Sequence, residues 1–187
     1  MRSLTSAEWK GSASDGLHAV FESADPFAPS VPANVAACTL LFPVTRRLSA
    51  QQVSAVSSAA RATGETEVCV TLTEASTAMG GQFDRGPHLV FAIDRYEEAI
   101  AESPIAVLEN ALYAVSGTWG MLFSNEDHAI AAGSVRFVET LLSKWPTPLE
   151  SIDAFAEHWT SLARDDGRDV SWLESLLRQI TAPPPTS

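Results

Sequence analysis

The chain is organised around one stretch, Asn110 to Pro146, with the sequence NALYAVSGTWGMLFSNEDHAIAAGSVRFVETLLSKWP. Two short apolar runs within it, Trp119–Phe123 and His128–Ala132, flank the four polar residues Ser124–Asp127. Apolar runs of this length on either side of a polar turn are typical of a β-hairpin. This hairpin is the first element that the sequence predicts.

Helices are expected on both sides of the hairpin. Gly133-Ser134 begins a helix that should run to about Lys144, because its apolar residues recur at helical spacing. Before the hairpin, Ser103-Pro104 starts another helical pattern, since proline is tolerated in a first turn, and Gly117 ends it. The apolar face of that expected helix consists of Ile105, Leu108, Leu112 and Val115.

Towards the N-terminus, three further strands are predicted from short apolar runs that contain β-branched residues. They are Val35–Phe42, Val68–Leu72 and His88–Ile93. A helix is expected between the first two of these strands. Ser49 can cap it and Gln52 can complete a capping box, and Gly64 provides a stop.

The C-terminal third predicts two helices. Thr147-Pro148-Leu149-Glu150 combines an N-cap, a proline in the first turn and a capping-box glutamate, and Gly167 ends that helix. Ser171 to Glu174 can begin the last helix. We therefore divide the chain into an irregular N-terminal segment (1–34), a single α+β domain (35–181) and a disordered tail (182–187).

The expected fold is α+β. It contains a mostly antiparallel sheet of about four to six strands, with helices on one face and a C-terminal helical segment.

Composition limits the function. The 187 residues include 23 acidic and 12 basic side chains, a net charge of −11, which disfavours nucleic acid as a partner. No apolar run is long enough to cross a membrane, and no secretory signal opens the chain. The only two cysteines, Cys38 and Cys69, lie in apolar runs, which favours a reducing cytoplasm over a disulfide scaffold.

No known catalytic or metal-binding motif is present, and we expect no cofactor and no metal. The four histidines, His18, His88, His128 and His158, have no metal-ligand spacing. Cys69 and His88 could form a thiolate–imidazole pair on adjacent strands, although buried structural roles fit their apolar surroundings better. Ser116-Gly117-Thr118 could expose a nucleophile, but we interpret it as a helix stop that leads into the hairpin.

The glycine-rich loop Gly80–Gly86 is a candidate contact loop. Its glycines would let backbone amides approach a ligand, and Arg85 could pair with a phosphate or carboxylate. No lysine and no following helix N-terminus complete a phosphate site, so a flexible loop is the simpler interpretation.

Charge is unevenly distributed along the chain. Residues 35–63 contain three arginines and no acid, whereas residues 64–104 contain eight acids against two arginines. A solvated acidic surface would explain this pattern, and so would a face complementary to a basic partner. The predicted partner-binding residues are Asp84, Asp94, Glu97, Glu98 and Glu102.

The hairpin stretch also carries a resemblance. Ser116-Gly117-x-Trp119-Gly120, then Ser124-x-Glu126-x-His128-Ala129 and Gly133-Ser134-x-x-Phe137, resemble a run in uncharacterised actinobacterial proteins. The chain is also loosely similar to small acidic immunity proteins of bacterial toxin systems, in which an acidic α+β domain plugs a basic toxin. This similarity implies a basic protein partner and assigns no individual residue.

Three functional hypotheses follow. The first is a cytoplasmic, acidic protein-binding module of the immunity or antitoxin type, which neutralises a basic protein. The second is an accessory or small-molecule-binding protein with a pocket beside the Gly80–Gly86 loop. The third is an enzyme with an unrecognised site, for which Cys69, His88 and His128 are the candidate residues.

Overall fold

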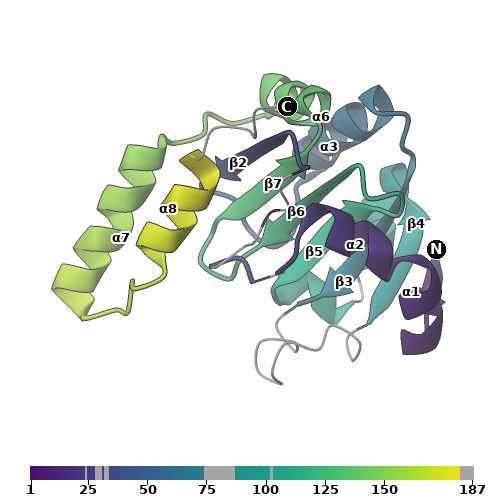
Figure 1. The fold of residues 1–187 in the computed structure, drawn as a ribbon, viewed down its shortest axis with the longest axis horizontal. Coiled ribbons are helices and arrows are strands. Elements are labelled where there is room, and N and C mark those ends of the chain that lie inside the picture. Colours follow the sequence, from purple (N-terminus) through teal and green to yellow (C-terminus); the bar gives the residue numbers. More distant parts are fainter. Residues whose placement is uncertain (24, 28–30, 32–33, 74–86, 102, 182–187) are drawn as a thin grey trace.

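A seven-stranded antiparallel sheet forms the centre of the described part of the chain (Figure 1). The computed structural model describes residues 1–187 except 24, 28–30, 32–33, 74–86, 102 and 182–187. The strand order is β1-β4-β3-β5-β6-β7-β2. The strands are β1 (Arg2–Leu4), β2 (Ala37–Leu41), β3 (Glu67–Leu72), β4 (His88–Ala92), β5 (Asn110–Ala114), β6 (Trp119–Phe123) and β7 (Ala129–Gly133).

The predicted hairpin is confirmed as β6 and β7, which pair from Trp119 opposite Gly133 to Phe123 opposite Ala129. Asp127 turns the chain with a φ of 54°, a left-handed conformation that aspartate tolerates better than most residues. At the other end, Gly133 has a φ of 151°, and a Cβ there would lie 2.8 Å from the Cα of Trp119. Only glycine fits this position.

The segment before the hairpin differs from the prediction. A short 3₁₀ turn, η3 (Pro104–Val107), is followed by strand β5, where a continuous helix was expected. Every residue of β5 is buried, because the strand lies in the middle of a sheet that is covered on both faces. Asn110 fixes the junction: its side-chain amide donates to the carbonyl oxygens of Ile105 (3.2 Å) and Leu108 (3.0 Å).

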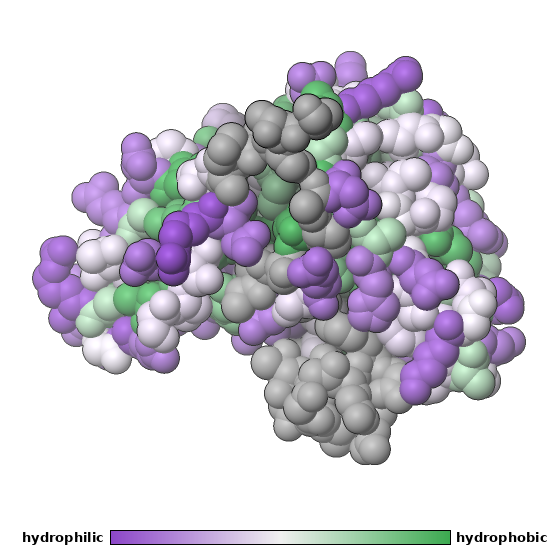
Figure 2. Space-filling model, viewed as in Figure 1, coloured by the Kyte–Doolittle hydropathy of each residue, from purple (hydrophilic) through white to green (hydrophobic). Residues whose placement is uncertain are grey.

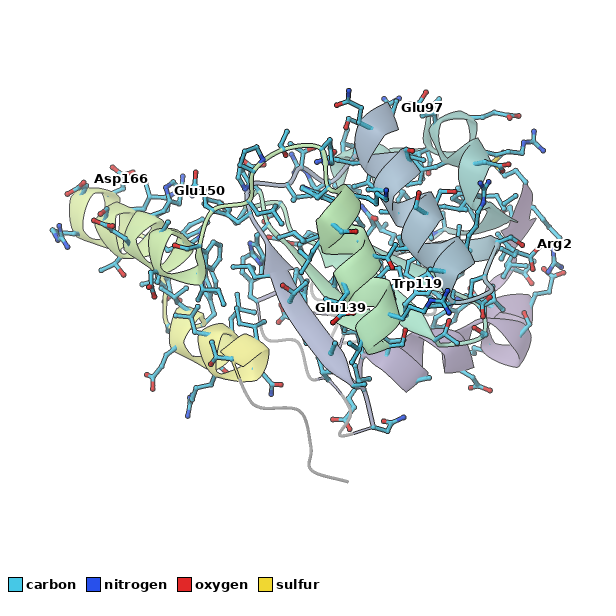
Figure 3. The ribbon with its side chains drawn as sticks, turned by 90° about the horizontal axis from the view of Figure 1, so that it is seen from above. Arg2, Glu97, Trp119, Glu139, Glu150 and Asp166 are labelled. Carbon is cyan, nitrogen blue, oxygen red and sulfur yellow. The ribbon has the colours of Figure 1, made fainter. Side chains whose placement is uncertain are left out.

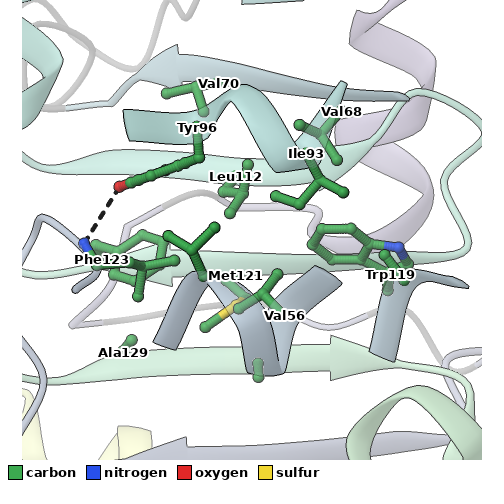
Figure 4. Packing of buried hydrophobic residues seen from close by; sticks show 14 of the residues in the cluster. Val56, Val68, Val70, Ile93, Tyr96, Leu112, Trp119, Met121, Phe123 and Ala129 are labelled. Atoms are coloured by element: carbon green, nitrogen blue, oxygen red, sulfur yellow. Dashed lines mark hydrogen bonds between the residues drawn. The ribbon is translucent and has the colours of Figure 1, made fainter. Parts of the chain in front are cut away.

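One face of the sheet is covered by helices from the middle of the chain. These are α3 (Ala50–Ala62), α5 (Tyr96–Ile100) and α6 (Val135–Lys144), with the 3₁₀ turn η2 (Ile93–Arg95). The capping box of Ser49 and Gln52 on α3 and the Ser134 cap on α6 are formed as predicted. The core on this face is largely apolar; Tyr96 buries its ring and accepts a hydrogen bond from the Leu48 amide (Figure 4).

The opposite face is covered by the two ends of the chain. The N-terminal end contributes α1 (Ser6–Ser12) and α2 (Ser14–Val20), and the C-terminal end contributes α7 (Ile152–Asp166) and α8 (Leu173–Thr181) (Figure 1). Residues 1–34 were expected to be irregular. Instead, Thr5 and Glu8 form a capping box, and Trp9 and Leu17 are buried against the sheet, so α1 and α2 are part of the core.

Both C-terminal helices are present, with one changed boundary. The cap of α7 is Ser151, whose hydroxyl accepts from the Ala154 amide, and not Thr147. Glu150, which was expected in a capping box, lies before this cap. Its backbone amide donates to Phe42 O at 2.8 Å and connects this segment to the residue after β2. Gly167 ends α7 in the left-handed conformation, as predicted.

The α+β class, the antiparallel sheet and the C-terminal helical segment are therefore confirmed. The sheet has two strands more than the five that the sequence named, and helices cover both faces and not one. In the described ranges, no helix has the length and apolar character needed to span a membrane.

Candidate functional site

Three of the five predicted partner-binding acids lie together on the surface. Asp94, Glu97 and Glu98 are exposed on η2 and α5, and Glu97 is labelled in Figure 3. Asp84 and Glu102 lie outside the described residues. Glu98 is paired with Arg95, whose Nε donates to the carboxylate at 3.0 Å, and this hydrogen bond lowers the pKa of Glu98.

The backbone under these acids is anchored in the core. Ile93, Tyr96 and Ile100 alternate with the exposed acids and are each 1% exposed. Because these anchors pack against the sheet, the carboxylates are presented from a fixed surface and not from a loop. Their role in partner binding stays a prediction.

The candidate catalytic residues Cys69 and His88 lie in a buried polar chain beneath α1. The indole of Trp9 donates to the Tyr113 hydroxyl at 2.7 Å, and that hydroxyl lies 3.1 Å from Thr71 Oγ1. His88 Nδ1 lies 3.2 Å from the same Thr71 oxygen, and its ring stacks on Trp9 with centroids 4.4 Å apart. These side-chain contacts join α1 to the three neighbouring strands β4, β3 and β5.

The register does not place the two residues of the supposed thiolate–imidazole pair opposite each other, although both contact the Thr71 hydroxyl. Cys69 lies opposite Val90, whereas His88 lies opposite Thr71. Burial raises the pKa of Cys69, so the thiol stays protonated near neutral pH, and a protonated thiol is a poor nucleophile. These contacts suit a structural role that ties α1 to the sheet.

Ser116 is exposed, as the nucleophile interpretation required, but it lies beside a carboxylate. Its hydroxyl donates to Glu65 Oε1 at 2.6 Å, and Thr118 Oγ1 lies 3.4 Å from the same oxygen. Gly117, with a φ of 77°, turns the chain between β5 and β6. The contacts stabilise this turn.

A pocket of about 280 Å³ lies beside the connection between α7 and α8, among the described residues. Three aromatic side chains and three charged ones line it: Phe27, Trp159, Trp172, Glu126, Arg168 and Asp169. They come from four separate places: the segment before β2, the β6–β7 turn, the inner face of α7, and the connection between α7 and α8.

The aromatic walls meet at steep angles. Trp172 lies 5.0 Å from Phe27 at 66° and 5.3 Å from Trp159 at 72°. Beneath them, His128 lies nearly parallel to Trp172, with centroids 5.9 Å apart, and its Nε2 donates to the carbonyl of Pro26 at 3.1 Å. Burial lowers the pKa of His128, so the ring is neutral at physiological pH and acts as part of the wall.

The charged groups at the pocket are held by an ion pair and by hydrogen bonds. Arg168 Nη1 lies 3.3 Å from Glu126 Oε2, which links the α7–α8 connection to the hairpin turn. Asp169 accepts a hydrogen bond from the Ser171 amide at 2.9 Å, and this bond lowers the pKa of the carboxyl. The indole of Trp172 donates to Asp169 O at 3.2 Å, so the ring and the carboxylate are held by the same turn.

Within the part of the chain that the structure describes, no group of three histidine, cysteine or acidic side chains is placed to hold a metal ion. The chain matches no family model, no curated protein and no solved structure. The likeness to actinobacterial and immunity proteins consequently stays a prediction.

This pocket was not predicted from the sequence. Its residues are spread from Phe27 to Trp172, and each lies in a turn or on a helix face that has no motif of its own. The only indication in the sequence was its content of five tryptophans. The ligand loop that was expected, Gly80–Gly86, lies outside the described residues.

Proposed function

We propose that this protein is an acidic, cytoplasmic protein-binding module of the immunity or antitoxin type, which pairs with a basic protein through the surface of η2 and α5. The observation that carries the proposal is that Asp94 and Glu97 are exposed on a turn whose alternate residues are buried in the core. Carboxylates on such a support lose little freedom on binding, which favours a charged partner.

The charge of the whole chain supports the same partner. A net charge of −11 attracts a basic protein over a distance comparable to the Debye length, about 10 Å at 0.1 M salt. Charge complementarity of this kind accelerates association and rejects acidic competitors. Glu98 contributes less than Glu97, because Arg95 already pairs with it.

The cysteines fit the proposed location. Cys38 and Cys69 are both free thiols, and burial raises the pKa of Cys38 to about 12. Two unreactive free thiols are typical of proteins that function in a reducing compartment.

A second candidate function is small-molecule binding. It is favoured by the 280 Å³ pocket, whose volume lies just below the roughly 300–1,000 Å³ of most ligand sites. The pocket that the sequence suggested beside the Gly80–Gly86 loop falls outside the described residues.

The test of the main proposal is capture of a partner from the host's lysate at low and high salt, followed by mass spectrometry. Wild-type protein should retain one stoichiometric basic protein at low salt and release it at high salt. The double variant Glu97→Lys/Glu98→Lys should weaken binding of that protein at least about tenfold at low salt.

The matched control is Glu139→Lys/Glu157→Lys, which changes the net charge equally at exposed positions on α6 and α7. Glu139 is labelled in Figure 3, away from Glu97. Equal binding by both double variants would show that total charge matters and the η2–α5 surface does not. Unchanged binding by the Glu97/Glu98 variant would exclude this surface as the interface.

A further inference from the structure

The pocket at the α7–α8 hairpin lies far from the acids of α5. Figure 3 separates Glu97 from Asp166, at the end of α7, along the long axis of the molecule. Arg168 and Asp169 follow directly after that end of α7, so the pocket and the η2–α5 surface are separate sites. An inference about the pocket is therefore independent of the proposed protein partner.

The angles between the rings restrict the shape of the ligand. A flat aromatic ligand is held best between two parallel rings, but Trp172 makes steep angles of 66° with Phe27 and 72° with Trp159. One face of Trp172 is also occupied by the nearly parallel ring of His128. Walls that meet at such angles fit a compact, rounded group that contacts several rings at once.

The charged side chains that line the pocket restrict the sign of the ligand's charge. Two carboxylates, Glu126 and Asp169, and one guanidinium, Arg168, line the pocket. Because Arg168 pairs with Glu126, the carboxylate of Asp169 is left to balance a ligand's charge. Residues 147–181, which include α7 and α8, contain seven acids and three arginines, and hydrophilic side chains cover much of this lobe in Figure 2. An anion would be repelled here.

A rounded cation on aromatic walls is recognised by the negative faces of the rings. An alkylated ammonium suits such a site better than a bare lysine ammonium, because the bare group is compact and strongly hydrated. We propose that this pocket binds an alkylated ammonium group, supplied either by a small molecule such as choline or by a methylated lysine of another protein. Trp159 and Trp172 provide the aromatic walls, and Asp169 provides the countercharge.

The experiment is a calorimetric titration of the full-length protein with three probes. Choline and a trimethyl-lysine peptide carry the cation, whereas 3,3-dimethylbutan-1-ol has the same shape as choline without the charge. At least one charged probe should bind saturably and about tenfold more tightly than the neutral one, as expected for a cation on aromatic faces. Tighter binding of choline identifies a small molecule as the source, and tighter binding of the peptide identifies a protein.

Four variants test the assignment of residues. Trp172→Leu should abolish binding of the charged probe, and Asp169→Asn should weaken it about fivefold while keeping the acceptor for the Ser171 amide. Arg168→Gln should strengthen binding about threefold, because it removes a positive charge and frees Glu126. Glu157→Gln, an exposed acid on α7 that does not line the pocket, should leave affinity unchanged.

The outcomes that overturn the proposal are equally defined. They are the absence of saturable binding by both charged probes, equal affinity for the neutral alcohol, or weaker binding by Arg168→Gln. Asp169→Asn and Arg168→Gln change exposed side chains, so they test the proposal even if Trp172→Leu does not fold.

Discussion

The two faces of the sheet are built differently. The face under α3, α5 and α6 is covered by helices from the middle of the chain, and its core is almost entirely apolar. The face under α1, α2, α7 and α8 is covered by the two ends of the chain, and it buries Thr71, His88 and His128 as well as apolar side chains.

We therefore expect the first face mainly to stabilise the fold and the second face also to bind a ligand. The second face contains both the buried Trp9–Tyr113–Thr71–His88 chain and the aromatic pocket. Elements that come from opposite ends of a chain leave a boundary between them, and a boundary lined by aromatic and charged groups can take a ligand.

The largest predicted effects are losses in the free energy of unfolding, and they should be equal for core substitutions on the two faces. Phe137→Ala on the apolar face and Trp9→Ala on the other should each lower the free energy of unfolding by about 3–5 kcal/mol, because both side chains are at most 2% exposed. Urea unfolding followed by circular dichroism measures this. A loss below about 1 kcal/mol for Trp9→Ala would mean that the N-terminal helices are not part of the cooperative core.

A smaller effect distinguishes two glycines of the N-terminal helices. A Cβ at Gly16 in α2 would lie 2.9 Å from the carbonyl oxygen of Ala114, whereas one at Gly11 in α1 has nothing within 4 Å. Gly16→Ala should therefore destabilise the protein by about 1–3 kcal/mol.

Gly11→Ala is the matched control. It should be neutral or stabilising by up to about 1 kcal/mol, because alanine favours a helix. Both melting temperatures can be compared in the same thermal scan. If the two variants melt alike, α2 does not pack against β5 as closely as described.

The smallest effect is a pH dependence that belongs to the second face. Burial lowers the pKa of His128, so the unfolded chain takes up a proton below its ordinary pKa of 6.5 more readily than the folded protein. Stability contributed by the neutral ring is complete above that pH and is lost as the pH falls, by at most about 1.4 kcal/mol per pH unit.

His128→Gln should reduce this loss, since glutamine keeps a donor for Pro26 O without a titratable ring. Urea unfolding at pH 7.5 and 5.5 measures the difference. An identical pH dependence in both proteins would contradict a neutral, buried His128.

The apolar face was largely predictable. The caps of α3 and α6 and the turn between β6 and β7 are local features, in which a few neighbouring residues determine the backbone. Strand β5 was predicted wrongly, because a strand that is buried on both sides loses its alternation. Leu108 and Leu112 then matched a helical spacing by coincidence.

The second face was not predictable in the same way. Trp9 meets Tyr113, 104 positions later, and Phe27 meets Trp172 across most of the chain. Nothing near Trp9 or Phe27 in the sequence indicates those contacts, because they depend on how the finished sheet brings the chain ends together. A site made of such contacts is visible only in the structure.

The most direct test of the binding role of the second face is the ¹H–¹⁵N spectrum of the five tryptophan indoles during titration with choline and with the trimethyl-lysine peptide. With at least one of these probes, the signals of Trp159 and Trp172 should shift in a saturable way, while those of Trp9, Trp119 and Trp145 stay in place. No shift at Trp159 or Trp172 with either probe, or equal shifts at all five, would contradict an alkylated-ammonium site in this pocket.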